Sequence, residues 1–416
     1  MNILIKSVTI PSFTQHSEEV DVWVKDGVFV AIGKHIDAPQ AQMIDGKNQI
    51  LSIGFFDLQA NLGEPGYETK ENLFSGCNAA AAGGFTGVAT TPVSLPVTQS
   101  KTAIAFLKNQ TQSTLVDLFP VAALSRDLLG KELNELYDMQ QAGAVAFSNH
   151  QQPITDTGFM YRALLYAKGI QALIISYPED AHLAGSAKIN ESAVSTFLGM
   201  KGIPTLAEEM AVARDLYLAE YTATRIHFTA ISTRNAVNLI RVAKQKGVQV
   251  TCDVAAHHLV LTEQALLSFD SNYKVKPPLR GEDDVNALIE GLQDGTIDAI
   301  VSQHTPHEIE YKNVEFETAA YGMIALQTVL PLALQTSLDI SLLMEKLAIN
   351  PRKILNLPVP QIKVGEPANL VLFNPHQVWT FSSENNYSIS QNSPFLNQPL
   401  TGKVNFICNK NQYQLC

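Results

Sequence analysis

The sequence has few cysteines and lacks any long hydrophobic run. Its four cysteines are scattered over 416 residues, with no C-x-x-C pair and no spacing that indicates a disulfide framework. No stretch approaches the roughly 20 apolar residues of a membrane-spanning helix. Residues 1–6 favour a short strand over an apolar leader segment. We therefore expect a protein of the reducing cytoplasm without a membrane segment.

Charge is also limited. Charged residues make up 17% of the chain, and the formal net charge of −11 argues against non-specific binding to nucleic acid or to acidic membranes. Hydrophobic residues make up 46%, an ordinary value for a well-buried enzyme fold. A chain of this length fits one large barrel together with a smaller domain.

Both ends of the chain are predicted to consist of short β-strands. The strand-like segments are residues 3–5, 20–24, 28–32, 369–373 and 402–407. A turn signal, Lys25-Asp26-Gly27, separates two of them. We predict that residues 1–50 and 361–416 together form one small β-sandwich domain.

Between these ends, apolar strand-like runs alternate with helical patterns. The runs are residues 51–57, 86–90, 117–124, 143–148, 171–176, 225–231, 247–254 and 297–302. Helical patterns fill most of the gaps, for example over residues 207–219 and 233–245. Eight such runs predict an α/β fold, a (β/α)8 TIM barrel over residues 51–360, with functional side chains at the carboxyl ends of its strands.

An ordered series of short motifs runs from about residue 50 to about residue 400. It includes Gly-Phe-Phe-Asp-Leu at 54–58, Lys-Pro-Pro-Leu-Arg at 276–280 and His-Thr-Pro-His at 304–307. The other motifs lie at residues 64–71, 79–86, 231–233, 257–259, 294–300 and 392–395. This set resembles the dihydroorotases, and more broadly the cyclic amidohydrolases such as allantoinase. The resemblance implies an amidohydrolase-type barrel in which one or two divalent metals, usually zinc, activate water against a cyclic amide.

The resemblance breaks where the family's metal ligands and general base stand. The first strand should end in Asp-x-His-x-His, and later strands should supply further Asp and His residues. The aligned positions hold Gln59, Asn61, Asn149, Tyr177, Ala230 and Gln303. Neutral amides are poor zinc ligands, alanine is none, and Gln303 cannot accept and return a proton. We therefore expect no metal cofactor, or at most one weak metal, and no catalytic residue.

The positions that the resemblance assigns to substrate binding are altered as well. Gly63 stands where an arginine is expected, Val93 where an asparagine is expected, and Lys276 where another asparagine is expected. A site that held a carboxylate would lose a bidentate contact with the missing arginine.

A smaller set of side chains remains as candidates for a residual pocket. These are Asp57, His150, His304 and His307. The resemblance places the pair His257-His258 outside the set of metal ligands. Tyr177 is more simply explained as filling the space of a lost histidine and metal than as a new acid–base group with Glu179 and Asp180.

These observations predict a dihydroorotase-like protein that is not catalytic. The resemblance implies a structural or regulatory role beside aspartate carbamoyltransferase in pyrimidine biosynthesis, and a homodimeric chain. One alternative is an active cyclic-amide hydrolase with a rearranged, at most mononuclear, metal site built from Asp57, His150, His304 and His307. A further alternative is a small-molecule binding module that keeps the cleft without turnover.

Overall fold

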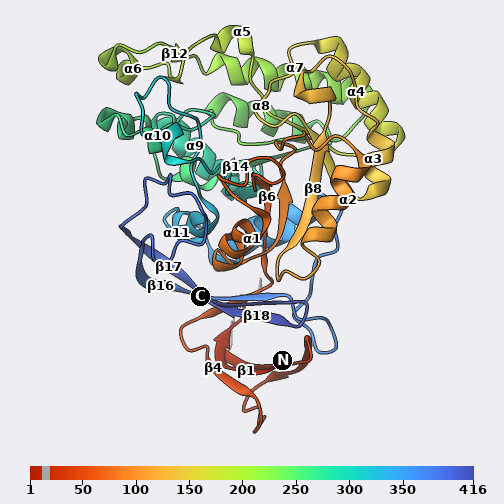
Figure 1. The fold of residues 1–416 in the computed structure, drawn as a ribbon, viewed down its shortest axis with the longest axis vertical. Helices are drawn as coiled ribbons and strands as arrows, with labels where there is room; N and C mark the ends of the chain where they lie inside the picture. The colour runs from red at the N-terminus through yellow and green to blue at the C-terminus, as the bar shows by residue number, and fades with distance from the viewer. Residues whose placement is uncertain (12–18) are drawn as a thin grey trace.

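Eight parallel strands form the centre of the molecule in the computed structural model (Figure 1). The structure describes residues 1–11 and 19–416. The strands are β6 (Phe55–Ala60), β7 (Phe85–Thr90), β8 (Asp117–Ala123), β9 (Ala146–Ser148), β10 (Ile174–Ser176), β13 (Ile226–Phe228), β14 (Val250–Ala255) and β15 (Ala299–Val301). Each strand pairs with the next, and a parallel bridge between Ala60 and His304 joins the first strand to the segment after the last. The predicted barrel is confirmed.

Helices cover the outside of this barrel (Figure 1). The longer ones are α1 (Leu73–Ala82), α2 (Lys101–Gln110), α3 (Leu136–Ala142), α4 (Thr157–Gly169), α7 (Leu206–Thr222), α8 (Arg234–Gln245) and α9 (Glu282–Gln293). The shorter ones are α5 (Ala181–Ala184), α6 (Ala193–Leu198), α10 (Ile309–Lys312), α11 (Val329–Leu334), α12 (Ile340–Met344) and α13 (Asn350–Ile354). Turns of 3-10 helix lie at η1 (Arg126–Leu128), η2 (Ala256–Leu259), η3 (Glu263–Ser268), η4 (Ser271–Tyr273) and η5 (Leu326–Thr328), and a π-helical turn lies at η6 (Glu345–Ile349). Within the described residues, no helix combines the length and the apolar character needed to cross a membrane.

Helix α8 shows why these segments are helical. The Thr233 side chain accepts a hydrogen bond from the Ala236 backbone N–H and caps the first turn. Val237, Ile240 and Ala243 are buried together with Ala236, at spacings that place them on one face of a helix. The remaining side chains are mostly polar and face outward, and the apolar face packs on the barrel.

Two layers of apolar side chains hold the barrel strands. One layer packs against the helices and includes Val88, Phe147 and Ile300. The other contains alternate residues of the same strands and forms the barrel interior. Ile354 and Leu355, at the end of α13, belong to this interior cluster and close it with apolar contacts.

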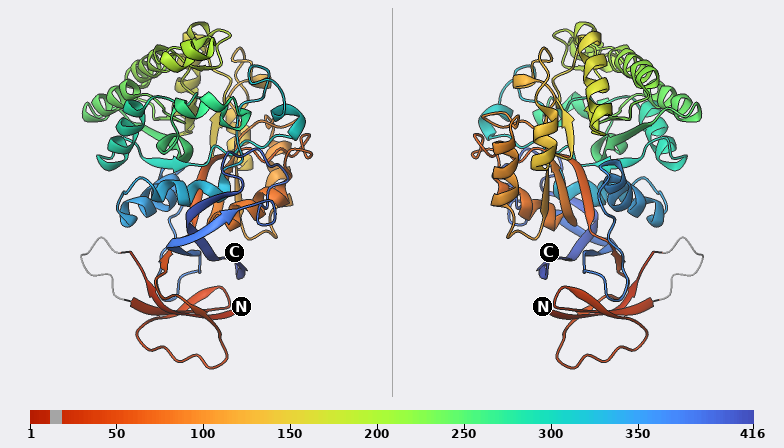
Figure 2. Two further views of the ribbon diagram at one scale, coloured as in Figure 1. Left: turned by 90° about the vertical axis from the view of Figure 1, so that its left-hand side faces the viewer. Right: turned by 90° about the vertical axis from the view of Figure 1, so that its right-hand side faces the viewer.

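The two ends of the chain meet in one largely antiparallel sheet below the barrel (Figure 2). Its strands are β1 (Asn2–Thr9), β2 (Glu19–Lys25), β3 (Val28–Gly33), β4 (Gln42–Asp45), β5 (Ile50–Ser52), β16 (Leu370–Phe381), β17 (Gln398–Asn409) and β18 (Gln412–Leu415). The join between the ends is the antiparallel pairing of β5 with β16, in which Leu51 stands opposite Leu372. The separate pair β11 (Ile189–Asn190) and β12 (Gly202–Ile203) lies in a connection of the barrel. The predicted fold class, with a small β domain from both termini, is confirmed.

One predicted strand is divided between the two sheets. The apolar run over residues 51–57 was expected to be a single barrel strand, and this expectation is wrong. Residues 50–52 pair with β16 in the terminal sheet, and β6 begins only at Phe55. Gly54 lies at the break, where a Cβ atom would meet the Thr86 side chain at 2.2 Å, so the chain passes between the sheets at a position that only glycine fits.

Candidate functional site

The carboxyl ends of neighbouring barrel strands bring the sequence-predicted positions together. Gln59 lies in β6 and Asn61 directly follows it, while Asn149, Tyr177, Ala230 and Gln303 lie within two residues of the ends of β9, β10, β13 and β15. All of them except Asn61 are buried. Because parallel strands end at one edge of the barrel, these positions surround a common centre.

Gln59 is held in a buried hydrogen-bond network. Its Nε2 donates to His150 Nδ1 (3.3 Å), and its Oε1 accepts from Thr229 Oγ1 (2.9 Å). Thr229 Oγ1 also lies 3.1 Å from both carboxylate oxygens of Asp253. That carboxylate lies 2.9 Å from His227 Nε2 and accepts from the Ala230 backbone N–H at 2.6 Å. The polar atoms of this part of the site therefore form hydrogen bonds with other groups of the protein.

The other amide side chains at the strand ends also have protein partners. Asn149 Oδ1 accepts from the Ser125 backbone N–H and hydroxyl, both at 3.1 Å. Asn61 Oδ1 accepts from the Gly63 N–H (3.0 Å). Gln303 Nε2 donates to the backbone carbonyl of Lys276 (2.8 Å). These bonds fix the loops that follow the strands.

An internal cation stands at the mouth of the barrel. Lys276 Nζ forms an ion pair with Glu179 Oε1 at 2.8 Å, with 19% and 8% of the two side chains exposed. The same ammonium lies 5.6 Å from the centre of the Tyr177 ring. Burial raises the pKa of the Tyr177 hydroxyl well above its ordinary value, and the nearby Glu179 charge acts in the same direction. Tyr177 is therefore a neutral packing residue here.

The strand-end residues do not fit the zinc ion that the family resemblance implies. A zinc site needs imidazole, carboxylate or thiolate donors that converge on one point. Gln59 and Asn149 offer neutral amides that are already bonded to protein, and Ala230 offers no donor. In residues 1–11 and 19–416, no group of three or more His, Cys, Asp or Glu side chains is placed to hold a metal ion.

The four residual-pocket candidates are engaged with separate partners. Asp57 accepts from the Ser302 N–H and hydroxyl (2.8 and 2.5 Å). His304 Nδ1 accepts from the Ala325 N–H (3.0 Å), which turns its Nε2 toward Glu71. His307 Nε2 lies 2.9 Å from the Tyr321 carbonyl and His150 faces Gln59. The structure therefore places all four near the carboxyl ends of the strands but does not converge them on a common point.

Burial is the main cause of the pKa shifts of Asp57, His150 and His307. The pKa of Asp57 is raised to about 6, because burial disfavours its charged form more than the Ser302 hydrogen bonds favour it. The pKa of His150 is lowered to about 4 by burial and, secondarily, by the Lys276 ammonium. At neutral pH His150 is therefore an uncharged imidazole.

The positions that the resemblance assigns to substrate binding lack the expected polar groups, and Gly63 has no room for a side chain. Gly63 has φ of +70°, and a Cβ atom there would approach the Glu71 carbonyl oxygen to 2.3 Å. An arginine at this position would require the backbone to move. The Lys276 ammonium is ion-paired with Glu179. Val93, partly buried in the loop after β7, has no polar atom in its side chain.

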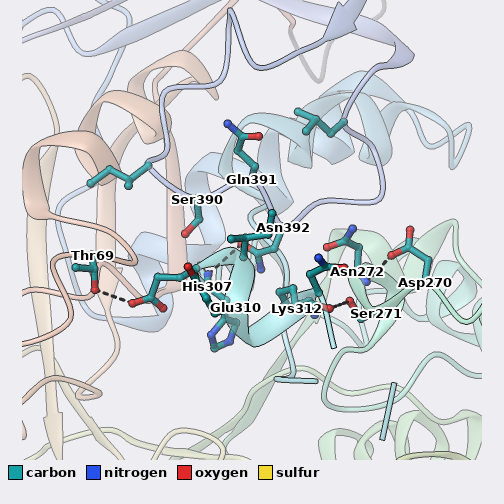
Figure 3. A pocket seen from close by; sticks show the side chains of 15 residues that line it. Thr69, Asp270, Ser271, Asn272, His307, Glu310, Lys312, Ser390, Gln391 and Asn392 are labelled. Carbon is teal, nitrogen blue, oxygen red and sulfur yellow. Dashed lines mark hydrogen bonds between the residues drawn. The ribbon is translucent and has the colours of Figure 1, made fainter. Parts of the chain in front are cut away.

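A cavity whose lining includes none of the six strand-end positions is shown in Figure 3. It has a volume of about 690 Å³ and is lined by residues of four segments of the chain, among them Thr69, Asp270 and Asn392. Of the residual-pocket candidates, only His307 lines it. Glu308 at its edge accepts a hydrogen bond from the Thr69 hydroxyl (2.6 Å).

The sequence analysis missed the buried groups that organise the centre of the site. Asp253 and His227 are polar residues in the largely apolar strands β14 and β13, and this departure from the strand pattern could have identified them in the sequence. Their pairing depends on the register of the two strands, in which Phe228 stands opposite Cys252. The partnership of Glu179 with Lys276 joins residues almost a hundred positions apart and left no local pattern.

The sequence comparisons with known proteins agree on one family. Residues 48–236 match a family model described as "Dihydro-orotase-like". The chain is 42% identical to a dihydroorotase of Geotalea daltonii, covering 97% of this chain and 96% of the relative, and 41% identical to a dihydroorotase of Syntrophus aciditrophicus, covering 97% of each. Among solved structures, L-hydantoinase (dihydropyrimidinase) from Arthrobacter aurescens superposes with a TM-score of 0.86 at 22% identity, over 99% of this chain and 95% of that chain. The structural match shows the shared fold.

Proposed function

Because this chain belongs to the dihydroorotase family and its strand ends offer no set of metal ligands, we propose that it is a dihydroorotase-type protein without the hydrolase activity. One observation carries the proposal: Gln59, Asn149, Ala230 and Gln303 stand where the resemblance expects ligands and a general base. A metal-activated water and a proton shuttle both need groups that these side chains lack.

The proposed role is that of a structural or regulatory subunit. By resemblance to non-catalytic dihydroorotase-like proteins, we propose aspartate carbamoyltransferase as the partner and pyrimidine biosynthesis as the context. The partner itself rests on the resemblance alone.

A second candidate is favoured by the names of the relatives. Proteins about 40% identical over nearly the whole chain are named dihydroorotase, which supports an active cyclic-amide hydrolase with at most one metal. Such a site would have to draw on Asp57, His150, His304 and His307. His304 and His307 would first have to leave their bonds to the Ala325 N–H and the Tyr321 carbonyl.

The deciding experiment measures metal and turnover on the same preparation. The purified chain is analysed for bound metal, then assayed with dihydroorotate and with carbamoyl aspartate in added zinc, with an active dihydroorotase as positive control. We expect well below one equivalent of metal and no turnover. One equivalent of tightly held metal together with turnover would establish the second candidate instead.

Two further measurements separate the remaining roles. Light scattering of the chain mixed with aspartate carbamoyltransferase tests the subunit role. If the two proteins do not associate at micromolar concentration, the subunit role is contradicted. A rise in melting temperature on adding dihydroorotate or carbamoyl aspartate without turnover would favour a binding module, because a ligand selective for the folded state stabilises it.

A further inference from the structure

The cavity of about 690 Å³ shown in Figure 3 has no part in the proposed function. Its volume lies within the roughly 300–1,000 Å³ of small-molecule sites in proteins. Its lining comes from four segments of the chain, around Thr69, Asp270, Glu308 and Asn392. A ligand in this cavity would therefore be bound independently of the six strand-end positions.

Two polar atoms of lining residues are buried without a hydrogen-bond partner among the described residues. They are His307 Nδ1 and Glu308 Oε2. His307 Nε2 lies 2.9 Å from the Tyr321 carbonyl, which can only accept, so Nε2 carries the proton and Nδ1 is an acceptor. Burial lowers the pKa of His307 to about 4, so the ring is neutral at neutral pH. Both atoms therefore need a hydrogen-bond donor, which a ligand can supply.

Carboxylates stand at two separate places in the lining. Thr69, whose hydroxyl donates to Glu308 Oε1 (2.6 Å), and Asp270 lie at opposite ends of the lining in Figure 3. Against the effect of burial, the Thr69 hydrogen bond and the Lys70 charge hold the pKa of Glu308 below its ordinary value, so this carboxylate is ionised at neutral pH. The exposed Glu310 adds a third carboxylate to the lining.

Two ammonium groups near the cavity are already engaged. Lys312 Nζ donates to two backbone carbonyls of the segment after α10, at 2.9 and 3.0 Å. Lys70 Nζ lies 5.0 and 4.9 Å from the ring centres of Tyr67 and Tyr311. In the part of the chain that the structure describes, neither ammonium forms an ion pair with a carboxylate of the lining. These carboxylates are therefore open to a cation that a ligand brings.

Apolar side chains complete the lining. Ile309, Ile389 and Leu396 belong to it, and the first two are 70% and 46% exposed. Methylene groups can pack on such side chains, while ammonium groups donate to carboxylates and to neutral acceptors. We propose that this cavity binds a linear aliphatic polyamine, with one ammonium at Glu308 and another at Asp270. Negative charge at these positions of a ligand would be repelled by the same carboxylates.

Isothermal titration calorimetry of the full chain with spermidine tests the proposal. The uncharged alkanediol of equal length and octylamine, which has one charge, are titrated in parallel. We expect one spermidine to bind per chain, at least about tenfold more tightly than octylamine, because a second ammonium adds a charged hydrogen bond. The diol is expected not to bind.

Two variants of equal size remove one carboxylate each. Glu308→Gln keeps an acceptor for the Thr69 hydroxyl, and Asp270→Asn keeps one for the Asn272 N–H (2.9 Å), so both are expected to fold as the wild type does. Each is expected to bind spermidine at least about tenfold more weakly. The matched control Glu282→Gln removes the same charge from an exposed residue of α9 and is expected to leave binding unchanged.

This control separates the cavity from a general attraction of cations to a chain of net charge −11. Equal weakening in Glu282→Gln, or equal affinities of the wild type and both cavity variants, would overturn the proposal. The absence of saturable spermidine binding at millimolar concentration, or a diol that binds as tightly as spermidine, would overturn it as well. No outcome depends on metal or turnover, so this proposal and the proposed function can fail separately.

Discussion

The amide side chains at the barrel mouth differ from the acids and imidazoles that the resemblance expects there, because amides can be buried without a cation. Several carboxylates held together in a buried site need a cation, because an uncompensated buried charge is costly. Gln59 and Asn149 carry no charge and meet their hydrogen-bonding needs with Thr229, His150 and Ser125. The charged pair of Lys276 with Glu179 at the barrel mouth supplies its own cation.

Removing one partner of this ion pair is expected to destabilise the fold. In Glu179→Gln the Lys276 ammonium loses its counter-charge in a largely desolvated position, so the free energy of unfolding should fall by about 1–3 kcal/mol. Urea denaturation measures the change. Glu191→Gln, at an exposed position, is the control and should change the free energy of unfolding by less than about 0.5 kcal/mol. Equal stabilities for both variants and the wild type would show that the pair is not needed.

Buried histidines are expected to make the fold sensitive to acid. Burial, and then the Arg280 charge, lower the pKa of His258 to about 4, from about 6.5 in an unfolded chain. Between these values the unfolded chain binds a proton that the folded chain does not, so stability falls as the pH drops below 6.5. His258→Gln should therefore lose less stability than the wild type between pH 7.5 and pH 5, by about 2 kcal/mol.

Urea denaturation at the two pH values measures this difference. The exposed His376 supplies the control, because His376→Gln leaves the buried imidazole in place and should keep the full acid sensitivity. An acid response of His258→Gln equal to that of the wild type would mean that His258 is protonated in the folded chain.

At the scale of elements, a buried carboxylate joins α7 to the start of α8. Glu208 accepts from the backbone N–H groups of Ser232 and Thr233 (2.9 and 3.0 Å) and lies 3.5 Å from the Arg280 guanidinium. Glu208→Ala would leave Arg280 and both N–H groups without this partner and should cost about 3–5 kcal/mol. Thermal and urea unfolding measure the loss. Asp283→Ala breaks an exposed pair with Arg234 and should cost less than about 0.5 kcal/mol.

Element boundaries show where sequence patterns reach their limit. The run over residues 86–90 matches β7 closely, because that strand is buried on both faces and is bounded by the Gly83-Gly84 turn. The run over 143–148 overestimates β9, which begins at Ala146, because Gly143 still belongs to the end of α3 with φ of +110°. Apolar composition reports burial, whereas strand ends are set by hydrogen-bond partners on other segments.

The sequence predicted where the residues of the candidate site lie in the fold, but not which residues they contact. The order of motifs located Gln59, Asn149 and Gln303 at strand ends, where the structure has them. Their partners Thr229, Ser125 and the Lys276 carbonyl come from other strands and loops, so only the closed barrel reveals them.

At the scale of the whole molecule, hydrogen bonds between protein groups close the barrel. The Asn61 N–H donates to the His304 carbonyl (2.9 Å) and joins the first strand to the segment after the last. Glu71 binds the hydroxyls of Ser75 and Ser388 and so ties the C-terminal loop to the barrel. These bonds hold together segments from opposite ends of the chain.

Stability that rests on such contacts should not depend on metal. We expect the melting temperature to change by less than about 1 °C when the chain is dialysed against a chelator, because an ion bound only by the folded state is what would raise it. A matched variant restores the donors that the resemblance expects, with Gln59→His, Asn61→His, Asn149→Asp, Tyr177→His, Ala230→His and Gln303→Asp. Its carboxylates and imidazoles would lack the present hydrogen bonds, so its melting temperature should be lower without zinc and rise by several degrees with it. A chelator effect on the wild-type chain would instead show that the fold holds an ion through other side chains.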